Sequence, residues 1–235
     1  MKSLFHPLQI VLTILGVGMI AASCARAGDA PKLLPAPIFD NAKSGEGTQT
    51  AVLSGGCFWG MQGVFEHVAG VRQVVAGYSG GQQSTAHYED VSGGDTGHAE
   101  SVRITFDPKQ VTYGEILRVY FSVAHDPTEL NRQGPDSGSQ YRSNIFVADD
   151  MQQKIARAYI AQLEKAHAFG APIVTRVDRL VAFYPAEGYH QDYLIHNPDS
   201  MYIVVNDQPK IANLKAIYPM LYREKPVMVS DRAPS

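Results

Sequence analysis

Between residues 49 and 148, the spacing of apolar residues predicts the order strand, helix, strand, strand, helix, strand. Residues 50–53 are apolar and run into Gly55-Gly56, as expected of a buried strand that ends in a turn. Residues 101–106 alternate between polar and apolar side chains, which indicates a strand with one buried face. This order is typical of a ferredoxin-like α+β fold, a split βαβ plait that forms a two-layer sandwich of sheet and helices. The 21 glycines and 14 prolines lead us to expect long loops around it, and the apolar pattern at 173–181 predicts an additional strand.

A cysteine stands where the first strand gives way to the first helix. Residues 58–68 place apolar side chains at helical spacing and stop before Gly70, so Cys57 is expected in the first turn of a helix. Free backbone N–H groups and the positive end of the helix dipole would favour a thiolate there. We also expect the glycines at 55 and 56 to leave open space in front of the sulfur. The alternative is that Cys57 is simply a small buried apolar residue.

The remaining pattern predicts further elements. Strands are expected at 71–78, 144–147 and 173–181, an extended segment at 201–205, and helices at 112–123, 149–170 and 209–217. Glu100 shares the parity of the apolar residues in its strand, so its carboxyl group should point toward the buried face. A carboxylate there is costly unless it is functional or paired. The alternative is a frayed strand end with Glu100 in solvent.

The first 27 residues are expected to be an export signal. A short positive start precedes an uncharged run at 10–22, which is too short for a comfortable membrane span. Cleavage after Ala25-Arg26-Ala27 is one form of processing that fits. The other is lipid attachment at Cys24, because Ala21-Ala22-Ser23-Cys24 resembles a bacterial lipoprotein box. Both predict an exported, periplasmic protein, either soluble or lipid-anchored at Cys24.

We expect the rest of the chain to divide into a flexible linker at 28–48, one catalytic domain at 49–222 and a polar tail at 223–235. A net charge of −3 and a hydrophobic content of 45% give no sign of a nucleic-acid partner.

The cysteine count constrains the chemistry. The chain has two cysteines, and Cys24 is removed or lipidated under either form of processing. The mature protein then carries Cys57 as its one thiol and cannot form an internal disulfide bond. If Cys57 is a nucleophile, hydrogen-bond donors and an acid must reach it from the loops at the same end of the sheet.

Four short motifs resemble those of the A-type peptide methionine sulfoxide reductases, in the same order along the chain. They are Gly55-Gly56-Cys57-Phe58-Trp59-Gly60, Gly97-His98-Ala99-Glu100, Ser139-Gln140-Tyr141-Arg142-Ser143 and Ala186-Glu187-Gly188-Tyr189-His190-Gln191. The resemblance extends from about residue 50 to 205, and the fold that it implies agrees with the plait expected above.

The resemblance implies four catalytic residues. Cys57 resembles the nucleophile that attacks the sulfoxide sulfur, and Glu100 resembles the acid that protonates the sulfoxide oxygen. Tyr88 and Tyr141 resemble the phenols that bind the same oxygen. Burial would raise the pKa of Glu100 and keep it protonated, as this role requires.

Further residues are implied for substrate binding. Phe58 and Trp59 resemble the apolar cage for the substrate methyl group, and Asp136 resembles a polar contact to the substrate. Tyr189 and His190 are similar to family residues near the site, and we expect them to have a supporting role.

The activity that this resemblance implies is reduction of the S epimer of methionine sulfoxide, in proteins and in free form, with a sulfenic acid left on Cys57. Many members of the family carry a second cysteine that resolves this acid, but this chain has none after Cys57. An external thiol is therefore expected, either a thioredoxin-like protein or a small dithiol. We expect a monomer with no bound cofactor and no metal.

Two other functions fit parts of the sequence. A cysteine hydrolase or acyltransferase would need a histidine base beside Cys57, and His98 or His190 could serve. A metal-binding or non-catalytic module would use the chain's eight histidines, but these show no paired ligand spacing.

Overall fold

The computed structural model describes residues 31–229, and the expected export signal, Cys24 and the end of the tail lie outside them. A six-stranded sheet with the order β7-β6-β1-β3-β2-β8 forms the centre, and a separate two-stranded ribbon pairs β4 with β5. The strands are β1 (Gln49–Ser54), β2 (Val71–Ser79), β3 (Ala99–Phe106), β4 (Arg132–Gln133), β5 (Asp136–Ser137), β6 (Asn144–Val147), β7 (Arg176–Arg179) and β8 (Phe183–Pro185).

Six α-helices and five short helical turns connect the strands in the described range. The helices are α1 (Phe58–Glu66), α2 (Tyr88–Ser92), α3 (Tyr113–Val119), α4 (Asp150–Lys165), α5 (Tyr193–His196) and α6 (Gln208–Ile217). The turns are η1 (Gln83–Thr85), η2 (Tyr120–Ala124), η3 (Ser139–Tyr141), η4 (Gly188–His190) and η5 (Ile203–Asp207).

The sheet is mixed. Antiparallel pairing joins β6, β1, β3 and β2 in that order. Strand β8 pairs with the outer edge of β2 and is also antiparallel. At the other edge, β7 runs parallel to β6. The sequence predictions for β1, β2, β3 and β6 are confirmed, and β7 lies within the strand expected at 173–181. The fold is therefore a mixed α+β fold with a curled sheet.

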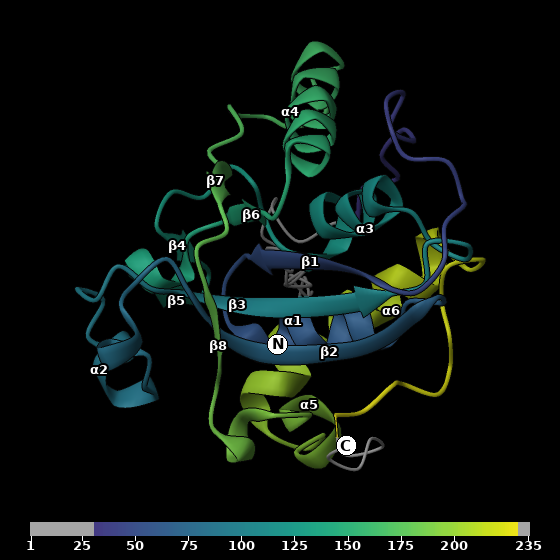
Figure 1. The fold of residues 1–235 in the computed structure, drawn as a ribbon. Coiled ribbons are helices and arrows are strands. Elements are labelled where there is room, and N and C mark those ends of the chain that lie inside the picture. The colour runs from purple at the N-terminus through teal and green to yellow at the C-terminus, as the bar shows by residue number, and fades with distance from the viewer. Residues whose placement is uncertain (1–30, 230–235) are drawn as a thin grey trace, which may run out of the picture.

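One face of the sheet carries the main core. Leu53, Val74 and Ile104 point into a large cluster that also contains side chains of α1, α3 and α4. Figure 1 shows α1 and α6 behind the central strands β1, β3 and β2. The opposite face has a smaller cluster around Val52 and Phe146. Alternation along the strands produces this division, because successive side chains point to opposite faces.

Local sequence signals mark where helices α3 and α4 begin. Thr112 and Glu115 form a reciprocal capping box at the start of α3, within the helix expected at 112–123. The Asp149 side chain accepts a hydrogen bond from the Gln152 N–H and caps α4.

Two segments differ from the sequence expectation. Residues 201–205 were expected to be extended, but Ile203–Asp207 forms a π-helical turn that leads directly into α6. Ile203 and Asp207 are buried in this helical turn. Their packing outweighs the preference of the β-branched residues in the segment for a strand. Strand β8 is not predicted by the sequence, because three residues carry too little periodicity.

The segment expected to be a flexible linker packs on the domain where it is described. Leu34 is buried, and its carbonyl oxygen accepts a hydrogen bond of 2.7 Å from Arg118 Nε. The Asp40 carboxylate accepts hydrogen bonds from the Gly114 N–H and the Thr112 hydroxyl. The composition of residues 28–48 shows a lack of periodicity, but it cannot show these long-range contacts.

The start of the tail is also tied to the domain. The Val227 N–H donates to the Glu66 carbonyl oxygen at 3.1 Å, and the Val229 N–H donates to Asp192 Oδ1 at 3.0 Å. Across the described residues, no helix combines the length and apolarity needed to cross a bilayer.

Candidate active site

Cys57 lies between the end of β1 and the first residue of α1, as the sequence predicts. Its side chain is only 9% exposed. Gly56 has a φ of +91°, which a residue with a side chain rarely adopts, so the turn requires glycine there. The two glycines do not leave open space, however. A Cβ at Gly56 would lie 2.7 Å from Gln133 Cβ, and one at Gly55 would lie 2.9 Å from His125 Cβ, so loop residues already fill these places.

Glu100 lies beside Cys57 and points into the protein, as its parity in β3 predicts. The Phe58 N–H at the start of α1 donates a hydrogen bond of 2.9 Å to Glu100 Oε2. The carboxyl group is 3% exposed. Burial raises the pKa of Glu100 to about 8; the Phe58 N–H opposes this shift, and Asp136 adds to it. Glu100 is therefore mostly protonated at neutral pH.

The expectation of a thiolate at Cys57 is wrong for the resting site. Burial raises the pKa of the Cys57 thiol well above its usual value, and it is raised further by Glu100, once that group ionises above about pH 8, and by Asp207. A hydrogen bond from the Trp59 N–H opposes the shift. The position at the helix start was predicted correctly, but desolvation outweighs the helix dipole, whose contribution is small by comparison.

The phenols of two tyrosines approach Glu100 and Cys57 from separate loops. Tyr88 begins α2 and Tyr141 ends η3, and both are half-buried. Burial raises the pKa of each phenol. Electrostatic interaction with Glu100 and Cys57 raises both pKa values further. The phenols therefore stay protonated and can donate hydrogen bonds beside the acid and the thiol.

Aromatic rings cover the start of α1. Phe58 is fully buried against His190, with ring centroids 5.0 Å apart, and Trp59 is stacked on Tyr193 at 3.8 Å. Trp59 Nε1 donates a hydrogen bond of 3.2 Å to His190 Nδ1. Burial lowers the pKa of His190, which favours the neutral ring that this bond requires. His190 thus orients the tryptophan.

Tyr189 and His190 are neighbours in the chain but lie in different surroundings. The His190 ring is 2% exposed and contacts Phe58, Trp59 and Tyr88. Tyr189 is 64% exposed and touches the group only through the His190 ring, at 4.3 Å.

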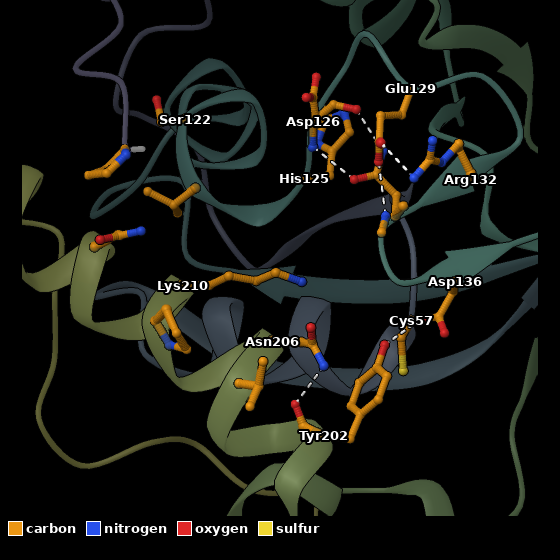
Figure 2. A pocket seen from close by; sticks show the side chains of 17 residues that line it. Cys57, Ser122, His125, Asp126, Glu129, Arg132, Asp136, Tyr202, Asn206 and Lys210 are labelled. Carbon is orange, nitrogen blue, oxygen red and sulfur yellow. Dashed lines mark hydrogen bonds and ion pairs between the residues drawn. The ribbon is translucent and has the colours of Figure 1, made fainter. Parts of the chain in front are cut away.

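Sequence reasoning missed Tyr202. Its hydroxyl donates a hydrogen bond to Asp136 Oδ2, and its ring lies edge-on to Trp59 at 5.8 Å. Figure 2 shows the Tyr202 ring beside Cys57 and Asp136. The residue stands in the segment predicted to be extended. Its place in a helical turn next to α6, which packs on α1, brings it to the site.

A cavity of about 600 Å³ opens beside Cys57. Its lining includes Cys57, Asp136 and Tyr202 together with residues of the loop 125–134 and of α6. The lining does not include Glu100, Tyr88, Tyr141, Phe58 or Trp59.

Three histidines near Cys57 are engaged elsewhere. His98 Nδ1 accepts from the Gly81 N–H and its Nε2 pairs with the Gln82 carbonyl oxygen. His125 pairs with the Tyr120 carbonyl oxygen and Thr175, and His190 accepts from Trp59. Within the described residues none of them hydrogen-bonds to the sulfur as a catalytic base would, so the hydrolase hypothesis is not supported.

Residues 31–229 contain no group of three or more histidine, cysteine, aspartate or glutamate side chains arranged to hold a metal ion.

A single thiol next to a protonated carboxylic acid and two phenols defines the class: a cysteine-dependent enzyme that supplies a proton to its substrate as the sulfur reacts. The family model for peptide methionine sulfoxide reductase matches residues 49–220. The chain belongs to this family and is an oxidoreductase that reduces methionine sulfoxide.

Curated relatives agree over nearly their full length. The chain is 60% identical to peptide methionine sulfoxide reductase MsrA 2 of Mesorhizobium japonicum, over 80% of this chain and 96% of the relative. It is 50% identical to MsrA 2 of Synechocystis sp., over 80% of this chain and 89% of the relative.

Solved structures agree as well. Methionine sulfoxide reductase A of Corynebacterium diphtheriae matches with a TM-score of 0.56 and 33% identity, over 72% of this chain and 89% of that one. Reduced Mxr1 of Saccharomyces cerevisiae matches with a TM-score of 0.57 and 34% identity, over 65% and 87% of the two chains.

Proposed function

We propose that Cys57 reduces the S epimer of methionine sulfoxide with Glu100 as the acid. The observation that carries this proposal is the pairing of a buried thiol with a carboxyl group that is anchored to the next residue's N–H and protonated at neutral pH. A sulfoxide oxygen is a poor leaving group until it receives a proton, and Glu100 is placed to give one.

The step balances without any other reactant. The Cys57 sulfur forms a bond to the sulfoxide sulfur, and the sulfur–oxygen bond of the substrate breaks and releases the oxygen as a hydroxyl group. That hydroxyl group then bonds to the Cys57 sulfur, the bond between the two sulfurs breaks, and methionine leaves while Cys57 becomes a sulfenic acid. Glu100 gives its proton to the oxygen, and the proton released from the thiol restores Glu100. Methionine sulfur gains two electrons, and the cysteine sulfur loses them.

The remaining groups have roles that their surroundings support. Tyr88 and Tyr141 donate hydrogen bonds to the sulfoxide oxygen, which their raised pKa values allow. Phe58 and Trp59 form the apolar wall for the methyl group. Asp136 holds Tyr202 and contacts polar parts of the substrate.

An external thiol then reduces the sulfenic acid. Cys57 is the free cysteine of the described residues, and no cysteine follows it in the given sequence. With Cys24 removed or lipidated as expected, no internal thiol is left to resolve the acid. A thioredoxin-like protein or a small dithiol would supply the electrons. We expect the protein to act as a monomer, because every group assigned above comes from one chain.

We also propose a ferredoxin-like fold and a periplasmic location for the protein. The order β6-β1-β3-β2 with antiparallel pairing supports a ferredoxin-like split βαβ plait at the centre of the sheet. The leader at 1–27 supports export to the periplasm, with a lipid anchor if Cys24 is the processing site.

A single-turnover experiment tests the chemistry. The reduced enzyme is mixed with the separated S and R epimers without thiol, and methionine and the mass of Cys57 are measured. We expect one equivalent of methionine and a sulfenic acid on Cys57 with the S epimer alone. Equal reaction of both epimers would contradict the assigned stereochemistry, and formation of methionine without modification of Cys57 would contradict the mechanism.

A further inference from the structure

The cavity beside Cys57 has two walls of different origin. The loop 125–134 forms one wall, and η5 with the start of α6 forms the other (Figure 2). Cys57 lies at its edge, whereas the acid, the phenols and the aromatic cage do not line it. Asp136 is the one proposed substrate-binding group in the lining, so the cavity reaches the sulfur mainly past residues that have no role in the first half of the reaction.

A buried ion pair forms part of the second wall. Asp207 is fully buried, and its Oδ1 lies 3.2 Å from Lys210 Nζ. Gly60 of α1 makes room for it, because a Cβ there would lie 2.1 Å from Asp207 Oδ1. Asp207 Oδ2 has no hydrogen-bond partner among the described residues. The carboxylate is thus enclosed against α1.

Lys210 is the member of this pair that faces the cavity. Its side chain is 26% exposed and lines the cavity, which Asp207 does not. Figure 2 shows the lysine side chain extending into the space between the two walls. The pair therefore presents its positive end to the cavity that reaches Cys57.

The other charges of the lining are held by their own partners. Arg132 pairs with Glu129 at 3.3 Å on the opposite wall. Asp136 accepts the Tyr202 hydroxyl, and Asp126 Oδ1 accepts hydrogen bonds from the backbone and side chain of Thr128. Among the cations of the lining, Lys210 is the one anchored by a fully buried carboxylate.

We propose that this cavity admits the external thiol that reduces the Cys57 sulfenic acid, and that Lys210, positioned by Asp207, attracts the negative charge of that thiol. This inference rests on the proposed function, because it concerns the second half of the same reaction. The occupant is a small thiol, and Lys210 acts on the negative charge of its attacking thiolate and on any charge that its tail carries.

The chemistry balances as two exchanges. A thiolate attacks the Cys57 sulfur, a disulfide forms between them, and the hydroxyl group leaves and takes up a proton to become water. A second thiolate attacks the first thiol's sulfur, which releases an external disulfide and Cys57. The two external sulfurs lose two electrons, and Cys57 gains them.

The test compares two thiols of equal length and opposite charge, 2-mercaptoethanesulfonate and cysteamine. The sulfenic acid is formed by one turnover with methionine sulfoxide, and its loss after addition of each thiol is followed by mass spectrometry. Rates are expressed per concentration of thiolate, and their ratio is compared between variants. We expect Lys210→Met to lower the sulfonate-to-cysteamine ratio by about fivefold. The lysine attracts one tail and repels the other, each by about twofold at a separation of roughly 8 Å in water, and the two effects multiply in the ratio.

Three variants make the result specific. Lys210→Arg should keep the ratio, since it retains the charge. Lys215→Met removes an exposed lysine of the same helix that pairs with Glu224, and should leave the ratio unchanged. A drop in Arg132→Met but not in Lys210→Met would overturn the inference, as would an unchanged ratio in Lys210→Met. If the wild type formed no sulfenic acid in the first turnover, the proposed function would fall, and this inference with it.

Discussion

The Phe58 N–H donates its hydrogen bond to Glu100, so the first free donor of α1 serves the acid and not the thiol. This bond links the residue after the nucleophile to the start of β3 and fixes the carboxyl group beside Cys57. It also limits the rise in the Glu100 pKa that burial causes, which leaves the value at about 8. The acid is therefore protonated at neutral pH without being too weak to give up its proton.

Cys57→Ser should abolish methionine formation. A serine hydroxyl is a much poorer nucleophile toward sulfur and cannot form a sulfenic acid. Methionine is measured by chromatography with dithiothreitol as reductant, and circular dichroism of the variant checks that the fold is kept. Residual turnover within tenfold of the wild type, as an order-of-magnitude limit, would remove Cys57 as the nucleophile.

Glu100→Gln should slow the first turnover by about 10²- to 10⁴-fold, because an amide cannot supply the proton. The rate is measured by quenched flow in the absence of thiol. Glu66→Gln is the matched control, since Glu66 is another buried carboxyl group with a pKa raised chiefly by burial, but it lies at the far end of α1. Equal loss in both variants would indicate a structural effect and not acid catalysis.

The first-turnover rate of the wild type should fall as the pH rises through about 8. Glu100 is active in its protonated form, and its pKa is raised to about 8, so the active form is present below that pH and is lost above it. A rate measured from pH 6 to 10 with a fixed excess of sulfoxide gives the profile. A steady increase over that range would show instead that formation of the Cys57 thiolate limits the reaction.

His190→Ala should raise KM for methionine sulfoxide more than it lowers kcat. The Trp59 indole loses the acceptor at 3.2 Å that orients it, so the apolar wall becomes less well defined. His190→Asn retains an acceptor and should restore much of the affinity. Tyr189→Phe is the neighbouring control, since its ring is largely exposed, and an equal rise in KM there would argue against a specific role for His190.

Gly60→Ala should destabilise the protein by about 1–3 kcal/mol, because the added methyl group would overlap the enclosed Asp207 carboxylate. Urea unfolding followed by tryptophan fluorescence measures the free energy. Gly170→Ala is the control: no heavy atom lies within 4 Å of its added Cβ, and the change should stay within about 0.5 kcal/mol. Equal stability of the two variants would show that Asp207 moves aside freely.

Much of the fold and site could be predicted from the chain. Alternation in β3 placed Glu100 on the buried face, and the change from strand to helix placed Cys57 at the start of α1. The four motifs identified the family, which the comparisons confirm. These features are encoded locally, by side-chain periodicity and by residues adjacent in sequence.

The protonation state of Cys57, the packing of residues 31–48 and the arrival of Tyr202 and Asp207 at the site could not be predicted in this way. Each depends on groups far apart in sequence. Asp207 acts on Cys57 across 150 positions because α6 packs on α1, and the pKa of the thiol depends on how completely the assembled protein excludes water.

The sequence by itself thus determined which chemical groups the protein has, including Cys57 as the one cysteine between residues 31 and 229. Only the tertiary structure decided their charge and their accessibility, since desolvation and long-range contacts exist only after the chain has folded.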